Sequence, residues 1–549
     1  MGRYRRVHRL LIVSLTIVVS VAGADVTGSR AQPHDDHPLG RVDFRISGSE
    51  PAQRGFNKAL ALLHHMTYPQ ARAAFEQVVV TDPQCAMAHW GIAMTLFQPL
   101  WPTRPKPDAL QRGWQEVQAA MALQPPTERE RLLVAAAEAF FLDPASTDYW
   151  LRIRRWEAAM ETAYAAFPDD DDVAAFYALA QLATAPGNSM TEARAHSERA
   201  ADILLRVYRR SPDHPGAMHY LVHASDMPGR ERETLEITRR YDAMAPNNPH
   251  ALHMPTHIYT RLGDWGGAIG GNLRAAEAAL QYPAGEHGEF VWDEFPHAIE
   301  YLIYACLQKG MDDQAAEQLR RLRSTTPLEP TFKTAFHLAS TQARYALERH
   351  AWPEAARIVP REPSNLDWDR FGWPESIAWF ARGLGAAHAG NLAEAKVAAA
   401  HLETPEAAAM KGGEELFSRQ IRILRLELNA WIAHAEGRAD SSLTSMREAA
   451  ELEVSTPKPS VTPGPTLPAQ ELLGDLLMEQ KKPVEALAAY RRSLNLYPKR
   501  FNSLMGAARA AREVGDQSMA RTYYQELLAV AGDGTRDSEL KEARSYVGQ

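Results

Sequence analysis

Two short stretches of this chain carry histidines at the same spacing. The stretch "GAMHYLVH" contains His219 and His223, and "HALHMPTH", 34 residues further along, repeats them as His253 and His257. Residues four apart lie one above the other on a helix face, so each pair could present two imidazoles to one metal ion. Imidazole ligands without thiolates suit zinc, copper or iron. The spacing therefore favours a transition-metal site built on helices.

The same histidine pairs could also arise without a metal site. The chain has 20 histidines, from which about one H-x-x-x-H pair is expected by composition alone. Two pairs in one register are harder to obtain by chance, but duplication of a repeat would copy both together. Such histidines could then be structural, or could line a groove that grips a peptide.

The elements that position these histidines are indicated by the repeats at the C-terminal end. Gly474 is followed by Ala486 and Tyr490, and the last two recur 34 residues later as Ala520 and Tyr524. This is the tetratricopeptide pattern, in which a small residue lets two helices approach and an aromatic residue packs between them. One helical hairpin cannot bury its apolar face alone, so neighbouring hairpins must stack.

The same register continues upstream less regularly, and apolar residues recur at helical spacing nearly throughout. We therefore expect an all-α fold, a tetratricopeptide-like superhelical solenoid of antiparallel helix pairs. The expected parts are an irregular solenoid over 51–454, a Pro-rich linker or surface spacer over 455–468, and a C-terminal repeat pair over 469–549. Insertions at 99–107 and 281–288 should form loops on one edge, commonly the binding edge.

The repeat register places the histidines on three consecutive first helices. In tetratricopeptide arrays the second, fifth and ninth places of the first helix face the concave groove, and the histidine pairs occupy the fifth and ninth places. The predicted metal ligands are His219, His223, His253, His257 and His297. We expect Glu300 to be a further ligand or the catalytic base, and His250 and Tyr304 to line the groove.

Two function classes follow from this arrangement. The first is a groove with a transition-metal site that stores the ion or activates water or oxygen, and so performs hydrolytic or oxidative chemistry. The alternative is a noncatalytic scaffold whose groove holds a peptide, a protein partner or a small molecule. A net charge of -8 and a pI near 6.2 argue against a nucleic-acid partner.

The N-terminus is typical of an export signal. Basic residues precede an apolar run over 10–21, and small residues follow at 22–24, so we expect residues 1–24 to be removed. An extended arm over 25–50 should follow, with a short extended segment at 42–46. No later segment has the ~20 apolar residues that span a bilayer. The mature chain is thus expected to be soluble in a periplasm or secreted, without stable membrane insertion.

Three stretches resemble a group of exported bacterial tetratricopeptide proteins of about this length. They are residues 56–94, beginning "FNKALALLHHMTYPQARAAFEQ", residues 252–265, "LHMPTHIYTRLGDW", and residues 462–498, beginning "TPGPTLPAQELLGDLLMEQ". The resemblance implies a solenoid and export, and it carries no settled activity. Members of the group often have a cysteine before the first repeat that could pair with the one matching Cys85. Here that region reads Ile46-Ser-Gly-Ser49, which puts such a disulfide in doubt.

The chain has only two cysteines, Cys85 and Cys306, far apart in sequence. In an elongated array such residues rarely meet. We expect two separate, buried thiols.

Overall fold

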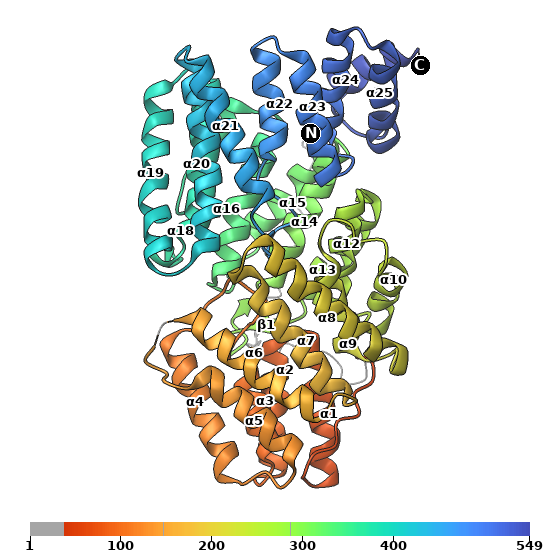
Figure 1. Cartoon of the computed structure of the whole chain (residues 1–549), viewed down its shortest axis with the longest axis vertical. Coiled ribbons are helices and arrows are strands. Elements are labelled where there is room, and N and C mark those ends of the chain that lie inside the picture. The colour runs from red at the N-terminus through yellow and green to blue at the C-terminus, as the bar shows by residue number, and fades with distance from the viewer. Residues whose placement is uncertain (1–37, 147, 286, 549) are drawn as a thin grey trace, which may run out of the picture. The chain divides into compact units, whose positions relative to one another are not determined.

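The computed structural model describes residues 38–146, 148–285 and 287–548. The expected signal over 1–24 and the first part of the expected arm lie outside the described residues. The described part is helical almost throughout (Figure 1). The helices up to the second histidine stretch are α1 (Glu50–His64), α2 (Tyr68–Thr81), α3 (Ala86–Met94), α4 (Pro107–Ala122), α5 (Glu128–Phe141), α6 (Tyr149–Ala166), α7 (Asp171–Thr184), α8 (Met190–Arg210), α9 (Pro215–Ser225), α10 (Leu235–Met244) and α11 (Pro249–His253).

The later helices continue the same pattern of consecutive, packed pairs (Figure 1). They are α12 (Pro255–Leu262), α13 (Trp265–Ala279), α14 (Glu294–Gln308), α15 (Asp312–Ser324), α16 (Phe332–Leu347), α17 (Trp352–Ala355), α18 (Gly372–His388), α19 (Leu392–Lys411), α20 (Glu415–Ala435), α21 (Ala439–Val454), α22 (Ala469–Glu479), α23 (Pro483–Leu496), α24 (Phe501–Val514), α25 (Gln517–Ala531) and α26 (Asp537–Val547). Two single 3-10 turns are η1 (Ala185–Gly187) and η2 (Trp368–Arg370).

Strands are minor in the part of the chain that the structure describes. The only named ones are β1 (Pro283–Ala284) and β2 (Phe290–Val291), which pair antiparallel across the insertion expected at 281–288. The segment at 42–46 forms no strand, although Val42 and Phe44 are buried. The fold is therefore all-α, as predicted.

The packing of α22, α23 and α24 shows why the tetratricopeptide pattern folds as it does. Tyr490 is buried between Gly474 on α22 and Gly506 on α24. A Cβ atom would come within 2.6 Å of the Tyr490 ring at Gly474 and within 2.4 Å of it at Gly506. Only a residue without a side chain lets the two helices close on the ring. The repeat is thus a pair of helices held around one aromatic side chain.

The expected first helices of three consecutive repeats are α9, the α11–α12 pair and α14, and α16 follows them. α12 packs against α9, α14 against α11, and α16 against α14. Pro255 has no N–H and interrupts the helix between α11 and α12. Met254 nevertheless keeps helical angles, φ -54° and ψ -41°. Residues 253 and 257 therefore still lie on one helix face.

The Pro-rich segment at 455–468 packs into the molecule. Its residues Val461, Thr462 and Leu467 are buried, and the Ser460 hydroxyl donates to the carbonyl of Leu100, 2.6 Å away and 360 residues back along the chain. This segment thus contacts residues far from it in the sequence.

Within the described residues, no helix combines the length and the apolar character that crossing a bilayer requires. Cys85 and Cys306 are both buried and both free, as the sequence led us to expect.

Candidate metal centre

Six histidines lie together where α9, α11, α12 and α14 meet, and they form two sets of three. We call His219, His223 and His250 the first triad, and His253, His257 and His297 the second triad. In each triad one possible ligand atom per residue lies within 4.8 Å of the others. The triads adjoin, because the His223 and His257 rings are 5.5 Å apart between centroids.

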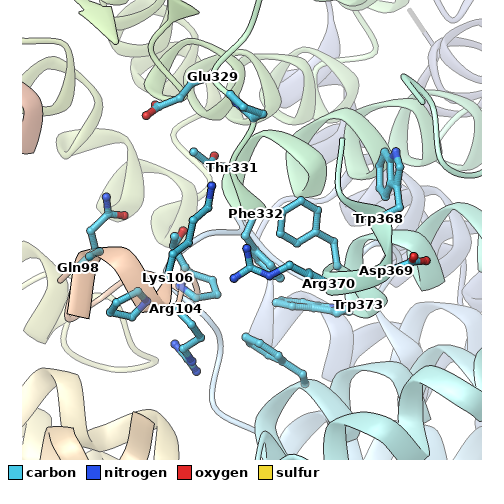
Figure 2. Close-up of a pocket in the computed structure, with 18 of the residues that line it drawn as sticks. Gln98, Arg104, Lys106, Glu329, Thr331, Phe332, Trp368, Asp369, Arg370 and Trp373 are labelled. Atoms are coloured by element: carbon cyan, nitrogen blue, oxygen red, sulfur yellow. The ribbon is translucent and has the colours of Figure 1, made fainter. Parts of the chain in front are cut away.

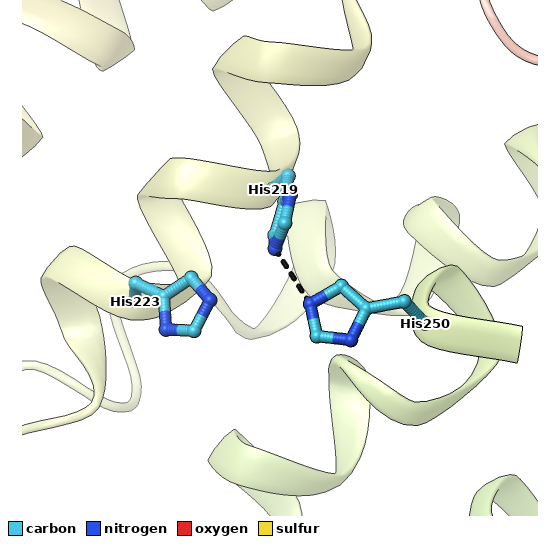
Figure 3. Close-up of side chains that lie close together, drawn as sticks. All are labelled: His219, His223 and His250. Atoms are coloured by element: carbon cyan, nitrogen blue, oxygen red, sulfur yellow. Dashed lines mark hydrogen bonds between the residues drawn. The ribbon is translucent and has the colours of Figure 1, made fainter. Parts of the chain in front are cut away.

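The first triad joins two helices (Figure 3). His219 and His223 project from α9, and His250 faces them from α11, with its Nε2 atom 3.0 Å from Nε2 of His219. His219 uses its other nitrogen, Nδ1, to donate to the carbonyl of His64 at 2.5 Å. His250 donates from Nδ1 to Glu294 at 2.8 Å. In their neutral forms the two rings would therefore turn unprotonated Nε2 atoms toward the same point.

The second triad repeats this arrangement with different partners. The Nε2 atoms of His253 and His257 are 3.1 Å apart. The Nδ1 atom of His253 donates to the side-chain oxygen of Asn272 at 2.7 Å, and that of His257 donates to Asp226 at 2.8 Å. The amide nitrogen of Asn272 donates to the carbonyl of Ala268 at 2.8 Å, so the side-chain oxygen of Asn272 is the atom that faces His253. Again two lone pairs meet.

The third member of each triad contributes a buried nitrogen without a partner. Nε2 of His223 and Nε2 of His297 are buried and accept no hydrogen bond from any described residue. His297 donates from Nδ1 to Nε2 of His337 at 3.0 Å, and His337 donates from Nδ1 to Glu300 at 2.5 Å. With Nδ1 of His297 as the donor in this contact, the free nitrogen of neutral His297 would be the unprotonated one.

Burial favours the neutral form of five of the imidazoles. Desolvation lowers the pKa of His219, His223, His253 and His297 well below the usual range, and neighbouring histidines lower it further. Burial also lowers the pKa of His257, against the opposing effect of Asp226. A hydrogen bond between His253 and His257 would need one ring to hold two protons, which these shifts oppose. A metal ion between the two nitrogens would satisfy both lone pairs.

Ionised carboxylates stand behind the ligand rings. Burial would raise the pKa of Glu294, but the charge of Lys333, with a hydrogen bond from His250, holds it well below its usual range. Burial would also raise the pKa of Asp226, but the charges of Lys458 and Arg261 hold that pKa well below its usual range. Metal-binding histidines commonly donate their second N–H to a carboxylate or carbonyl, which fixes the tautomer and the ring orientation. The triads have this outer layer already in place.

A third cluster, His64, Asp172 and His214, shows what a purely structural arrangement looks like. Both histidines donate from Nε2 to the same Asp172 oxygen, at 2.8 Å and 3.2 Å. Their Nδ1 atoms accept from the hydroxyl of Tyr220 and from the backbone N–H of Ala217. Every ring nitrogen of this cluster is thus used in a hydrogen bond, whereas each triad has a buried ring nitrogen without a partner.

The structure brings together all five histidines predicted as ligands and adds His250, which we expected only to line the groove. Glu300 is fully buried and accepts from His337, from Ser340 at 2.6 Å and from Arg344 at 2.9 Å. Those partners lower its pKa although burial alone would raise it. Both Glu300 oxygens are engaged, so Glu300 orients His297 through His337 and lies outside the triads.

Tyr304 does not join the histidines either. It is 1% exposed, and its hydroxyl accepts from Arg500 at 3.0 Å. Its ring packs edge-on against Trp265 with centroids 5.5 Å apart. Tyr304 is therefore a core residue, and the expectation that it lines an open groove does not match its position.

Sequence reasoning missed His337, Ser340 and Arg344, which hold Glu300. The signal was present: they follow His297, Glu300 and Tyr304 at an offset of 40 residues, on the next first helix, α16. Extending the same register by one repeat would have found all three. Asp226, Glu294 and Asn272, which accept hydrogen bonds from the triad histidines, do not recur at the repeat spacing and could not be found in this way.

The sequence predicted that the histidines face a groove, but in the structure they are enclosed. The side chains of five of them are each at most 1% exposed, namely His219, His250, His253, His257 and His297. Two insertions cover them. Trp101, from the insertion at 99–107, packs edge-on against His250 and His297 with ring centroids 5.6 Å and 5.3 Å away. From the Pro-rich segment, Lys458 pairs with Asp226 at 2.8 Å. The histidines are thus enclosed by parts of the chain that the repeat pattern does not include.

Comparison with the sequence models of known protein families gives no match, and neither does comparison with curated proteins. Among solved structures, the chain is similar to the crystal structure of the APC/C hetero-tetramer Cut9–Hcn1. That match has 13% sequence identity, covers 91% of this chain and 90% of that chain, and has a TM-score of 0.30. The fold assignment therefore rests on the helix packing described above.

Proposed function

We propose that this chain binds two transition-metal ions, one in each triad. The observation that carries the proposal is the pair formed by His253 and His257, whose neutral rings face each other through unprotonated nitrogens 3.1 Å apart. The first triad repeats the spacing, with Nε2 of His219 and Nε2 of His250 3.0 Å apart. In each triad the third histidine adds a buried nitrogen without a protein partner.

The distances suit a shared ion after a small adjustment. Two nitrogens bound to one tetrahedral ion at about 2.0–2.1 Å lie about 3.3 Å apart. The observed separations of 3.0 Å and 3.1 Å are close to this value, and small rotations of the two rings would reach it. Three histidines also leave a fourth tetrahedral position open, as in catalytic zinc sites. Each ion would then be able to hold a water molecule or another small ligand.

The donor set narrows the choice of ion. All six donors are imidazole nitrogens and none is a thiolate or carboxylate, which suits copper or zinc better than magnesium or calcium. Copper(II) binds nitrogen ligands more tightly than the other divalent first-row ions. We therefore expect copper to displace zinc at equal concentration. Zinc would supply an acidified water for hydrolysis and copper would supply redox chemistry, so the identity of the bound ion decides between the two reaction types.

The peptide-binding alternative has less support at the histidines. A peptide in the groove of a repeat array needs exposed side chains to contact, and five of the six histidines are almost fully buried. Trp101 and the segment at 455–468 would both have to move before a peptide reached them. We therefore assign the histidines to metal ions.

Elemental analysis of protein purified without a histidine tag tests the proposal. Reconstituted with copper or zinc and then desalted, the full chain should retain two ions. The double variant His253→Ala, His257→Ala should lose one of them while keeping its helical circular dichroism. His89→Ala is the matched control, because His89 is partly buried and paired with Glu116 at 2.7 Å but lies outside the triads. Less than a tenth of an equivalent in the reconstituted chain would contradict the proposal.

A further inference from the structure

The structure has a cavity of about 1250 Å³ (Figure 2), and none of the six triad histidines lines it. Its wall includes residues 102–106, which directly follow Trp101, and residues from α16, α18 and α20. Trp292 also lines it, and Lys333 lies between the Trp292 and Trp101 rings, 5.6 Å and 4.3 Å from their centroids. The insertion at 99–107 thus covers the histidines with Trp101 and forms the cavity wall with the residues that follow.

Stacked aromatic rings form one side of this cavity. Phe417 stacks on Phe332 with centroids 5.5 Å apart and an interplanar angle of 14°. It also stacks on Trp373, again at 5.5 Å, at an angle of 29°. All three residues line the cavity. A planar ring is the shape that such a side accommodates by stacking.

Cationic groups lie next to these rings, and the Arg104 guanidinium is 5.3 Å from the Phe417 ring centroid. Arg104, Lys106 and Arg370 extend into the same space beside Phe332 and Trp373 (Figure 2). Lys106 is exposed and forms no ion pair with any residue that the structure describes. Arg370 has only a long contact of 3.9 Å to Asp367. Arg104 is held by Glu414 at 2.6 Å and lies over the Tyr149 ring, so it is rigidly placed.

The carboxylates of the same cavity are mostly engaged or neutral. Asp369 and Glu375 both pair with Arg361, each at 2.9 Å. Glu289 accepts from the backbone N–H of His287. Burial, helped by Asp293, raises the pKa of Glu329 to about 8, so at neutral pH this carboxyl can donate a hydrogen bond. Asp108 and Glu289 form no ion pair among the described residues either, so the cavity holds unpaired groups of both signs, and Lys106 and Arg370 are the charged groups beside Phe332 and Trp373.

We propose that this cavity binds a small molecule with a planar aromatic ring and an anionic group. The ring stacks on the side formed by Phe332, Trp373 and Phe417, and the anionic group is held by Lys106 and Arg370. A carboxylate and a phosphate share this chemistry, and an aromatic acid and a nucleotide are the two sources that the experiment separates. The ligand would lie across Trp101 from the triads, and its binding does not depend on a bound metal.

Isothermal titration with chosen probes tests the site on the full chain. The probes are 2-naphthoate, its neutral analogue 2-naphthamide, the non-aromatic cyclohexanecarboxylate, and AMP. Either 2-naphthoate or AMP should bind at least tenfold more tightly than both 2-naphthamide and cyclohexanecarboxylate. Tighter binding of 2-naphthoate would identify an aromatic acid as the ligand class, and tighter binding of AMP would identify a nucleotide. Equal binding of 2-naphthamide would overturn the role of charge, and equal binding of cyclohexanecarboxylate would overturn the role of stacking. No binding of any probe would overturn the proposal as a whole.

Variants locate the binding within the chain. The double variant Lys106→Glu, Arg370→Glu should weaken binding of the preferred probe at least tenfold, and Phe417→Leu should weaken it several-fold. Lys541→Glu, a charge reversal on the remote helix α26, is the control and should leave the affinity unchanged. Unchanged affinity in the double variant would overturn the assigned anion site. Titrations on metal-free and metal-loaded protein should agree, so failure here is distinguishable from failure of the two-ion proposal.

Discussion

His253 and His257 face each other across one helical turn, with Nε2 atoms 3.1 Å apart and Nδ1 atoms bonded to Asn272 and Asp226. The outer hydrogen bonds fix which nitrogen of each ring carries the proton. They therefore leave two unprotonated nitrogens in contact inside the protein, where nearby water is scarce. The spacing is favourable only with a cation between them, and this relationship makes specific predictions.

Removal of one outer partner should weaken one ion selectively. Asn272→Ala takes away the acceptor of the His253 N–H, so the ring loses its fixed tautomer and orientation. Loss of such partners typically costs 10–100-fold in metal affinity. Competition with a chelator of known affinity should show that loss for one of two ions, with the other unchanged. An equal loss at both ions would contradict two independent triads.

The third ligands should distinguish the triads from each other. His223→Gln should reduce the metal content from two ions to one, and so should His297→Gln, because each change removes one of three nitrogens from a different triad. Combining the two changes should remove both ions. Metal content by mass spectrometry, with circular dichroism as the folding control, checks this. If His223→Gln alone released both ions, the two triads would form a single site.

Trp101 should control the rate of metal exchange. Its ring lies against His250 and His297 and helps to shield the triads from solvent. Trp101→Ala should leave the number of bound ions at two and raise the rate of release to a chelator at least tenfold in stopped-flow measurements. Trp352→Ala, which removes a ring stacked on the distant His388, should not change the rate. Unchanged release from the Trp101 variant would contradict its role as a cover.

A buried carboxyl outside the metal centre should affect stability as the pH rises. Both oxygens of Glu427 are buried without a hydrogen-bond partner among the described residues, and burial followed by the charge of Glu453 raises its pKa well above 4.5. The folded state therefore keeps a proton that the unfolded chain releases above about pH 4.5, so stability falls as the pH rises toward the raised pKa. The loss is about 1.4 kcal/mol per pH unit for one such group.

Glu427→Gln should remove this group's share of the decline. Urea unfolding between pH 5 and pH 8 should give a smaller loss of stability for the variant than for the unaltered chain. Glu453, whose pKa burial raises to about 7, remains and accounts for part of the residual slope. Glu513→Gln on the exposed face of α24 is the control and should leave the slope unchanged. Identical slopes for all three proteins would show that Glu427 does not hold its proton.

The helical repeats and much of the histidine centre were predictable from the sequence. Spacing alone was enough to pair His253 with His257, since four residues make about one turn of a helix. The 34-residue register also placed His219 and His223 on the neighbouring first helix. Local periodicity carries this information because each repeat packs mainly against the next one.

The grouping into triads was not predictable in the same way. His250 belongs with His219 because α11 turns its ring toward α9, whereas His253, three residues later, turns toward His257 and His297. The burial of the site was also missed. Repeat spacing predicts how neighbouring hairpins stack. It does not predict that an insertion from far along the chain packs over the histidines.

That covering segment has a consequence for how the protein is made. Arg344 donates to the carbonyls of Gly464 and Pro465, and Ser460 donates to that of Leu100. A ribosome produces the helices that carry the histidines well before it produces these residues. During synthesis the six imidazoles should therefore be accessible for a time, and they become enclosed once the segment at 455–468 emerges and docks. The order of translation thus gives the nascent chain a period in which metal ions can enter.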